Sequence, residues 1–173
     1  MAVSVASAPV AASSVIVRQY LIGTGFLCDL ARPEKLACPA VSEAENGDTI
    51  EVTGEGTLRP AGDKADGGGT FVHKHHGKVL GRGTWEAVRL ISFASYGSGS
   101  VQGLPEEFEG GLAVMSVRLT SESGLQFDAI LAIDCALGSI PEGAAEGITL
   151  SIPDANLDFN EKLSGFTLFI MEG

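Results

Sequence analysis

Residues 125–137 limit the possible folds most, because an apolar side chain occupies every second position of the segment. Period two places successive side chains on opposite faces of a β-strand, so the pattern predicts a strand with one buried face. Residues 49–58 and 112–120 alternate in a similar way, and no segment shows a strong helical period. The chain is therefore predicted to be all-β. The apolar positions of the first segment are Leu125, Phe127, Ala129, Leu131, Ile133, Cys135 and Leu137.

Further strands are predicted at residues 15–28, 70–75, 78–93, 148–152 and 163–171. The 23 glycines follow no collagen-like period and indicate many turns between short strands. About eight antiparallel strands with short connections fit a single closed β-barrel of the calycin or dirigent kind. A β-sandwich is the alternative.

One domain accounts for the length, because 173 residues are enough for one core and too few for two. We expect residues 15–173 to form the antiparallel barrel. Residues 1–14 are rich in Ala, Ser and Val. They are expected to form an N-terminal arm that is either flexible or docked as a strand on a neighbouring subunit.

The net charge of −11 argues against two classes of partner. Nucleic acids and anionic membrane surfaces both require clustered Lys and Arg, so neither is expected to bind. No apolar run reaches the roughly 20 residues of a spanning helix. Arg18 is the first basic residue, and the missing basic start argues against a signal peptide. We therefore expect a soluble protein, with the compartment left open.

Three cysteines leave the redox compartment undecided. Cys28 and Cys38 flank a short loop and could close a disulfide, whereas Cys135 lies on an apolar strand face and is expected to be a buried thiol. The chain has no nucleophile elbow, phosphate-binding loop or dinucleotide fingerprint. No cofactor is therefore expected.

His73, His75 and His76 are the only histidines and lie together. If His76 and the following glycine form a two-residue hairpin turn, His75 faces Lys78 and His73 faces Leu80. The rings would then point outward beside an ammonium group, with no Asp or Glu near them in the sequence. A solvated hairpin tip is therefore expected, and no metal site.

The candidate binding residues are Trp85, Arg89, Ile91 and Phe93. Period two places all four on one side of a strand, and Val72 should share that side across the hairpin. Rings and aliphatic groups with one fixed charge would suit a small apolar ligand that carries a carboxylate or another oxygen acceptor.

A buried Arg89 requires a partner, because an unpaired buried charge is very costly. The partner could be a ligand carboxylate. An internal salt bridge, with Asp128 or Asp134 as candidate partners, or an arginine at the barrel end is the more ordinary arrangement, and with an internal salt bridge the interior would be packed solid.

Tyr96-Gly97, followed by Ser100-Val101-Gln102-Gly103, resembles a strand-turn stretch of the allene oxide cyclases and dirigent-like barrels. The resemblance covers only these residues. It implies a small barrel, and no catalytic residue is transferred from it.

Two hypotheses about function follow. The first is a barrel that binds a small apolar or amphiphilic molecule inside, with isomerase or cyclase activity as one form and residues 97–111 as a lid. The second is a structural or self-assembling protein, a homo-oligomer whose arm supplies an intersubunit strand. An empty interior would favour binding, and a filled one would favour structure.

Overall fold

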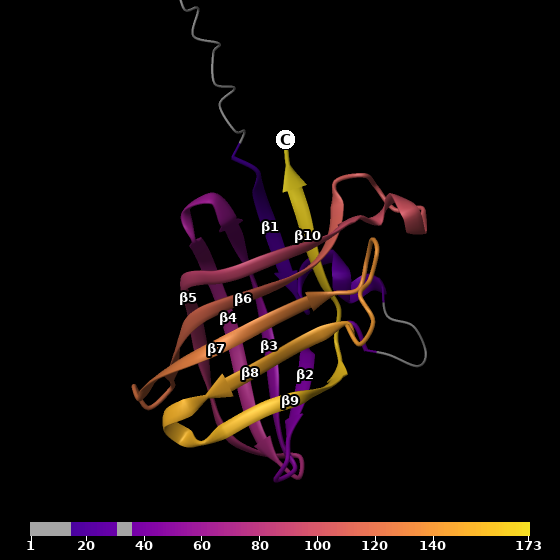
Figure 1. Ribbon diagram of the computed structural model, residues 1–173. Helices are drawn as coiled ribbons and strands as arrows, with labels where there is room; N and C mark the ends of the chain where they lie inside the picture. Colours follow the sequence, from indigo (N-terminus) through magenta and orange to yellow (C-terminus); the bar gives the residue numbers. More distant parts are fainter. Residues whose placement is uncertain (1–14, 31–35) are drawn as a thin grey trace, which may run out of the picture.

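Ten strands form one antiparallel sheet in the computed structural model, which describes residues 15–30 and 36–173 (Figure 1). Four short 3-10 helices, η1 (Gly25–Leu30), η2 (Pro60–Gly62), η3 (Gly99–Gln102) and η4 (Pro153–Ala155), connect some of them. The strands are β1 (Val17–Ile22), β2 (Ala40–Ala44), β3 (Asp48–Arg59), β4 (Lys64–His75), β5 (Lys78–Ser98), β6 (Phe108–Ser121), β7 (Gln126–Cys135), β8 (Gly147–Ile152), β9 (Leu157–Ser164) and β10 (Thr167–Glu172).

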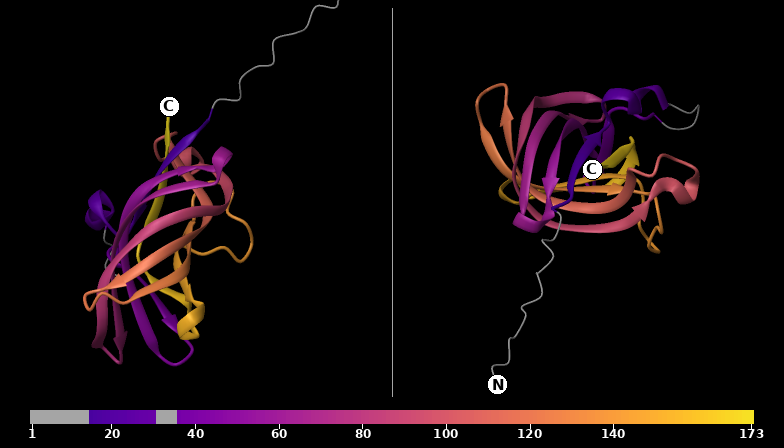
Figure 2. Two further views of the ribbon diagram at one scale, coloured as in Figure 1. Left: turned by 90° about the vertical axis from the view of Figure 1, so that its left-hand side faces the viewer. Right: turned by 90° about the horizontal axis from the view of Figure 1, so that it is seen from above.

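Hydrogen bonding closes the sheet on itself. Strands β2 to β9 pair in sequence order, and β9 pairs with β2 to complete a ring of eight strands. Strands β1 and β10 pair with each other, and they also join β3 to β6. The view from above in Figure 2 shows the sheet curling around a common interior. The prediction of a single antiparallel, barrel-like sheet is confirmed.

The core fills the ring with the inward faces of the strands, so among the described residues the expected binding site inside the barrel is not found, and this filled interior favours the structural hypothesis. In β7 the predicted alternation holds, because Ala129, Leu131, Ile133 and Cys135 are all buried. Leu125 is 61% exposed because it lies in the turn before the strand. The regular antiparallel pairing of β7 with β6 keeps successive side chains on alternate faces.

Strand β5 departs from the predicted alternation. Its pairing with β6 shifts register between Ala87 and Arg89 and again between Leu90 and Ser92. Each extra residue of such a bulge reverses the faces of the side chains that follow. Trp85 and Leu90 are therefore buried while Arg89 is exposed.

The prediction that Arg89 and Ile91 share the buried side of Trp85 is wrong for this reason. Ile91 is 40% exposed. Val72 is also on the other side, because Trp85 pairs with Gly69 and Phe71 is the buried residue of that stretch.

A disulfide joins Cys28 to Cys38, a pairing that the sequence left open, and Cys135 is a free buried thiol, as the sequence predicted. The disulfide links η1 to the segment that leads into β2. Within residues 15–30 and 36–173, no helix is long and apolar enough to cross a membrane. The predicted arm, residues 1–14, lies outside the described residues.

Candidate functional site

Strand β6 changes partner near its start, and this creates a fork in the sheet. From Gly111 onward it pairs with β7, but Phe108 and Glu109 pair with β10. Gly110 lies at the branch, where an added Cβ would stand 2.0 Å from the carbonyl oxygen of Leu137. The chain after β7 therefore turns away from β10 and leaves a gap between them.

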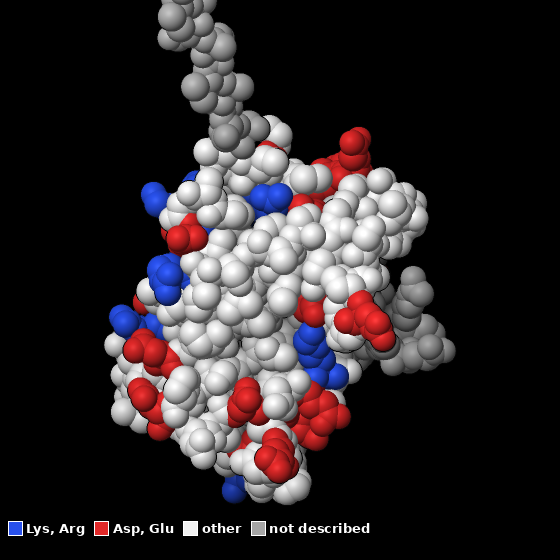
Figure 3. All heavy atoms as spheres, in the orientation of Figure 1, with Lys and Arg blue, Asp and Glu red and all other residues white. Residues whose placement is uncertain are grey.

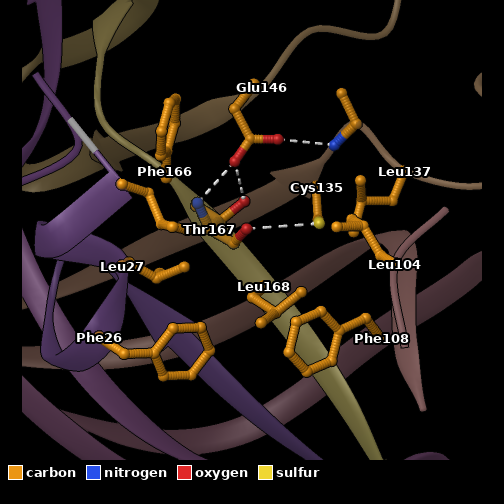
Figure 4. A pocket seen from close by; sticks show the side chains of 12 residues that line it. Phe26, Leu27, Leu104, Phe108, Cys135, Leu137, Glu146, Phe166, Thr167 and Leu168 are labelled. Carbon is orange, nitrogen blue, oxygen red and sulfur yellow. Dashed lines mark hydrogen bonds between the residues drawn. The ribbon is translucent and has the colours of Figure 1, made fainter. Parts of the chain in front are cut away.

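A cavity of about 570 Å³ occupies this gap (Figure 4). Its size is within the usual range of roughly 300–1,000 Å³ for small-molecule sites. Helix η1 forms one side, Leu104 and Phe108 form another, and the ends of β7 and β10 form the floor. Most lining residues are apolar: Phe26, Leu27, Leu30, Leu104, Phe108, Ala136, Leu137, Phe166 and Leu168, beside Cys135, Glu146 and Thr167.

The apolar wall is built by residues far apart in the sequence. The rings of Phe26 and Phe108 stack with centroids 6.0 Å apart, so η1 contacts the start of β6 directly. Phe26 is nevertheless 43% exposed and Leu30 is 50% exposed. Apolar side chains left open around a cavity are typical of a binding site.

Glu146 supplies the polar end of the cavity. It precedes β8, and its carboxylate accepts hydrogen bonds from the Ala136 amide at 2.7 Å and from the Thr167 amide at 2.5 Å. The Thr167 hydroxyl lies 2.8 Å from the same carboxylate. Burial raises the pKa of Glu146 above its ordinary value, as does the charge of Asp134, while these hydrogen bonds act to lower it.

The hydroxyl of Thr167 has two acceptors for its single proton. It lies 2.9 Å from the carbonyl oxygen of Asp134 and 2.8 Å from Oε1 of Glu146. A hydroxyl donates once and accepts otherwise. Both contacts are hydrogen bonds at the same time when Glu146 is protonated and donates to Thr167, which agrees with the raised pKa of Glu146.

Cys135 lies in the floor as a hydrogen-bond donor. Its Sγ donates to the carbonyl oxygen of Thr167 at 3.4 Å. Burial, followed by the charge of Glu146, raises the pKa of the Cys135 thiol far above its usual range. Because the thiolate is the reactive form, this cysteine is not an activated nucleophile.

Asp134 organises a polar cluster behind the cavity. It accepts hydrogen bonds from the Tyr96 hydroxyl at 3.0 Å and from Nζ of Lys162 at 2.8 Å. Burial and the hydrogen bond to Asp134 raise the pKa of Tyr96 to about 12. Neither Asp134 nor Asp128 pairs with Arg89 as the sequence suggested, because Asp128 pairs with Arg118.

The four residues predicted to bind a ligand do not line this cavity. Trp85 is a core residue whose Nε1 donates to the carbonyl oxygen of Thr53 at 2.9 Å. Phe93 is partly buried against the core, while Arg89 and Ile91 lie on the outer surface.

Among the residues that the structure describes, Arg18 is an arginine with a largely buried side chain. Its guanidinium makes a bidentate pair with Glu109, which is 3% exposed, and stands 4.6 Å above the ring of Phe93. In the sequence, the feature that could have indicated this buried ion pair was a basic residue that interrupts the apolar strand predicted at residues 15–28.

The histidine hairpin differs from the prediction in its register, in the direction of His73 and in the presence of a nearby carboxylate. The two-residue turn at His76 and the pairing of His75 with Lys78 are confirmed, but a bulge pairs His73 with Gly81 rather than Leu80. His73 therefore lines a second cavity of about 340 Å³ at the other end of the ring.

Asp48, distant in the sequence, accepts hydrogen bonds from both His73 and His75 at 2.7 and 2.5 Å. Burial alone would raise the pKa of Asp48, but the two imidazoles lower it below its ordinary value. Within residues 15–30 and 36–173, no group of three or more His, Cys, Asp or Glu side chains is arranged to hold a metal ion.

The expected lid is more ordered than a long loop. Strand β5 extends to Ser98, η3 follows, and β6 begins at Phe108, so only residues 103–107 lack regular structure. The side chain of Gln102 exchanges two hydrogen bonds with the backbone of Gly138. This anchor places Leu104 over the cavity.

Comparison of the chain with protein-family models, with curated proteins and with solved structures found no match.

Proposed function

We propose that this protein binds a small, mainly apolar molecule in the cavity between η1 and the ends of β7 and β10. The observation that carries the proposal is a cavity of about 570 Å³ whose wall is apolar except at Glu146, Thr167 and Cys135. A cavity of this size with a few converging polar groups and titratable groups of shifted pKa, here Glu146 and Cys135, is the usual form of a small-molecule site.

The expected affinity is modest. Burial of an eight-carbon chain contributes about 6 kcal/mol at roughly 0.8 kcal/mol per CH₂ group. The lost freedom of the ligand offsets a large part of this gain. A dissociation constant on the order of micromolar to millimolar is therefore expected for a simple aliphatic ligand.

Isomerase or cyclase activity would require a group that moves a proton. Glu146 is the lining residue suited to that role, because burial raises the pKa of its carboxyl group and so favours the protonated form that can give up a proton. Cys135 is not suited, since its thiol stays protonated. Catalysis in this cavity would therefore depend on Glu146.

Filling the cavity tests the proposal. Ala136 lines the cavity, so Ala136→Phe should occupy it, whereas Ala94→Phe makes the same change on the exposed outer face of β5. We expect the uncharged dye Nile red to bind saturably to the parent and to Ala94→Phe, with binding lost in Ala136→Phe. Equal binding by all three proteins would contradict the proposed site.

Self-association is a second candidate, favoured by the outer face of β5–β8. Ser92, Val114, Ala132 and Thr149 pair in one row across these strands, and the front of Figure 3 is almost free of charge there. Arg89, Arg118 and Asp128 lie elsewhere on the outside of β5–β7, so the uncharged part of this face is the row itself. In a protein with net charge −11, that part is where two copies meet with least repulsion.

Light scattering tests this second candidate. If the face joins two copies, Val114→Glu should reduce the mass to that of a monomer. If the N-terminal arm joins them instead, deletion of residues 1–14 should do so. A monomeric parent protein would rule out both.

A further inference from the structure

The hydrogens of the polar groups on the cavity wall are already used within the protein. The Cys135 thiol donates to the carbonyl oxygen of Thr167. The amides of Thr167 and Ala136 donate to Glu146. The Thr167 hydroxyl donates its single proton either to Asp134 or to Glu146. None of these groups around Glu146 therefore has a hydrogen left to offer a ligand.

The acceptor capacity of Glu146 is not exhausted. Its two oxygens have about four lone-pair positions, of which the Thr167 amide and hydroxyl use two on Oε1 and the Ala136 amide uses one on Oε2. If Glu146 is protonated, the proton lies between Oε1 and Thr167, and Oε2 remains an acceptor. In both states Oε2 keeps one free acceptor position.

We propose that the ligand is an apolar molecule that donates a hydrogen bond to Oε2 of Glu146, through a hydroxyl or an amino group. This inference rests on the proposed function of the cavity. The aliphatic and aromatic wall takes the body of the molecule, and Glu146 fixes its polar end (Figure 4).

A carboxylate ligand does not fit this wall. It would bring a negative charge close to Asp134, and close to a second charge whenever Glu146 is ionised, without a free donor among the groups around Glu146 to receive it. The net charge of −11 adds to the repulsion. The expected ligand thus donates a hydrogen bond, whereas the ligand expected for a pocket around Arg89 would have accepted one through a carboxylate.

Two isomers test the inference on the native protein. 1-Octanol and heptyl methyl ether have the same formula and nearly the same apolar surface, but only the alcohol donates a hydrogen bond. Displacement of Nile red should give the alcohol an affinity roughly tenfold to a hundredfold higher, the usual effect of one hydrogen bond to a carboxylate. Octylamine shows whether a charged donor binds better than a neutral one.

Glu146→Gln should remove the preference, because an amide NH₂ at the free position donates rather than accepts. Glu142→Gln, an exposed change in the same connection between β7 and β8, is the control for charge and should keep the preference. If Glu146→Gln does not fold, the comparison of 1-octanol with heptyl methyl ether on the native protein still tests whether the ligand must donate a hydrogen bond.

Each outcome has one meaning. A preference for alcohol or amine over ether supports the inference. Equal or better binding of the ether overturns the inference and leaves the proposed function intact. No displacement by any of the three compounds, with no saturable Nile red binding, overturns both.

Discussion

The ion pair between Arg18 and Glu109 offers the sharpest test of the fold. The guanidinium lies 2.5 Å and 3.1 Å from the two carboxylate oxygens, and the two side chains are 12% and 4% exposed. Arg18 is on β1 and Glu109 is on β6, and β10 lies between these two strands. The ion pair therefore spans β10 and holds β1 and β10 in place between β3 and β6. Ser95 is the other donor to Glu109, at 2.5 Å.

Arg18→Met removes the guanidinium and leaves a buried carboxylate with one neutral donor. Breaking a buried pair from one side costs about 3–5 kcal/mol, a large share of a typical stability of roughly 5–15 kcal/mol. At about 2–4 °C per kcal/mol for a chain of this size, the midpoint of thermal unfolding should fall by roughly 6–20 °C. Adding Glu109→Met should restore most of the loss, because well-packed apolar replacements of buried pairs are often neutral.

The exposed pair Arg118–Asp128 is the matched control. Its atoms are 3.3 Å apart and its side chains are 43% and 73% exposed, so Arg118→Met should cost less than about 1 kcal/mol. Urea unfolding followed by far-ultraviolet circular dichroism measures all four proteins. A loss in Arg18→Met no larger than in Arg118→Met, or a double variant less stable than Arg18→Met, would refute the reasoning.

Two further predictions concern the hairpin and the disulfide. The pKa of Asp48 is lowered in the folded state, so its bonds to His73 and His75 stabilise the protein above the unfolded pKa of about 3.9 and cease to do so as pH falls through the folded value. Asp48→Asn should cost about 1 kcal/mol near neutral pH, and urea unfolding should show this difference shrinking below about pH 4; a pH-independent difference would contradict it. Replacing Cys28 and Cys38 by Ser should cost about 2–3 kcal/mol, from the closure entropy of their 10-residue separation, and an unchanged urea midpoint would show that the disulfide adds nothing.

The sequence predicted those parts of the fold that depend on local pattern. Alternation identified β6 and β7 because they pair without bulges along most of their length. The hairpin turn at His76 was predictable because the following glycine adopts a positive φ at no steric cost. In β5 the same alternation misplaced Arg89 and Ile91, because nothing in the sequence marks where a bulge inserts its extra residue.

The candidate site and the other polar contacts were not predictable, because the residues that form them are far apart in the sequence and are brought together only by strand pairing. Glu146 and Thr167 are 21 residues apart, and Arg18 and Glu109 are 91 apart. Asp48 and His73 are neighbours across β3 and β4 and are separated by 25 residues. A search for short motifs considers none of these pairs, and a carboxylate near the histidines was missed for this reason.

The fork at Gly110 links the fold to the cavity. Because an added Cβ would lie 2.0 Å from the carbonyl oxygen of Leu137, Gly110→Ala must push apart the chain segments that form the cavity wall. Such overpacking costs about 1–3 kcal/mol.

Gly81 is the control: an added Cβ there meets nothing within 4 Å, and its φ is not positive, so Gly81→Ala should leave stability nearly unchanged. Urea unfolding should separate the two variants, and Gly110→Ala should also weaken saturable Nile red binding. If it matched Gly81→Ala in both assays, the close approach of β6 to Leu137 would not be what shapes the cavity.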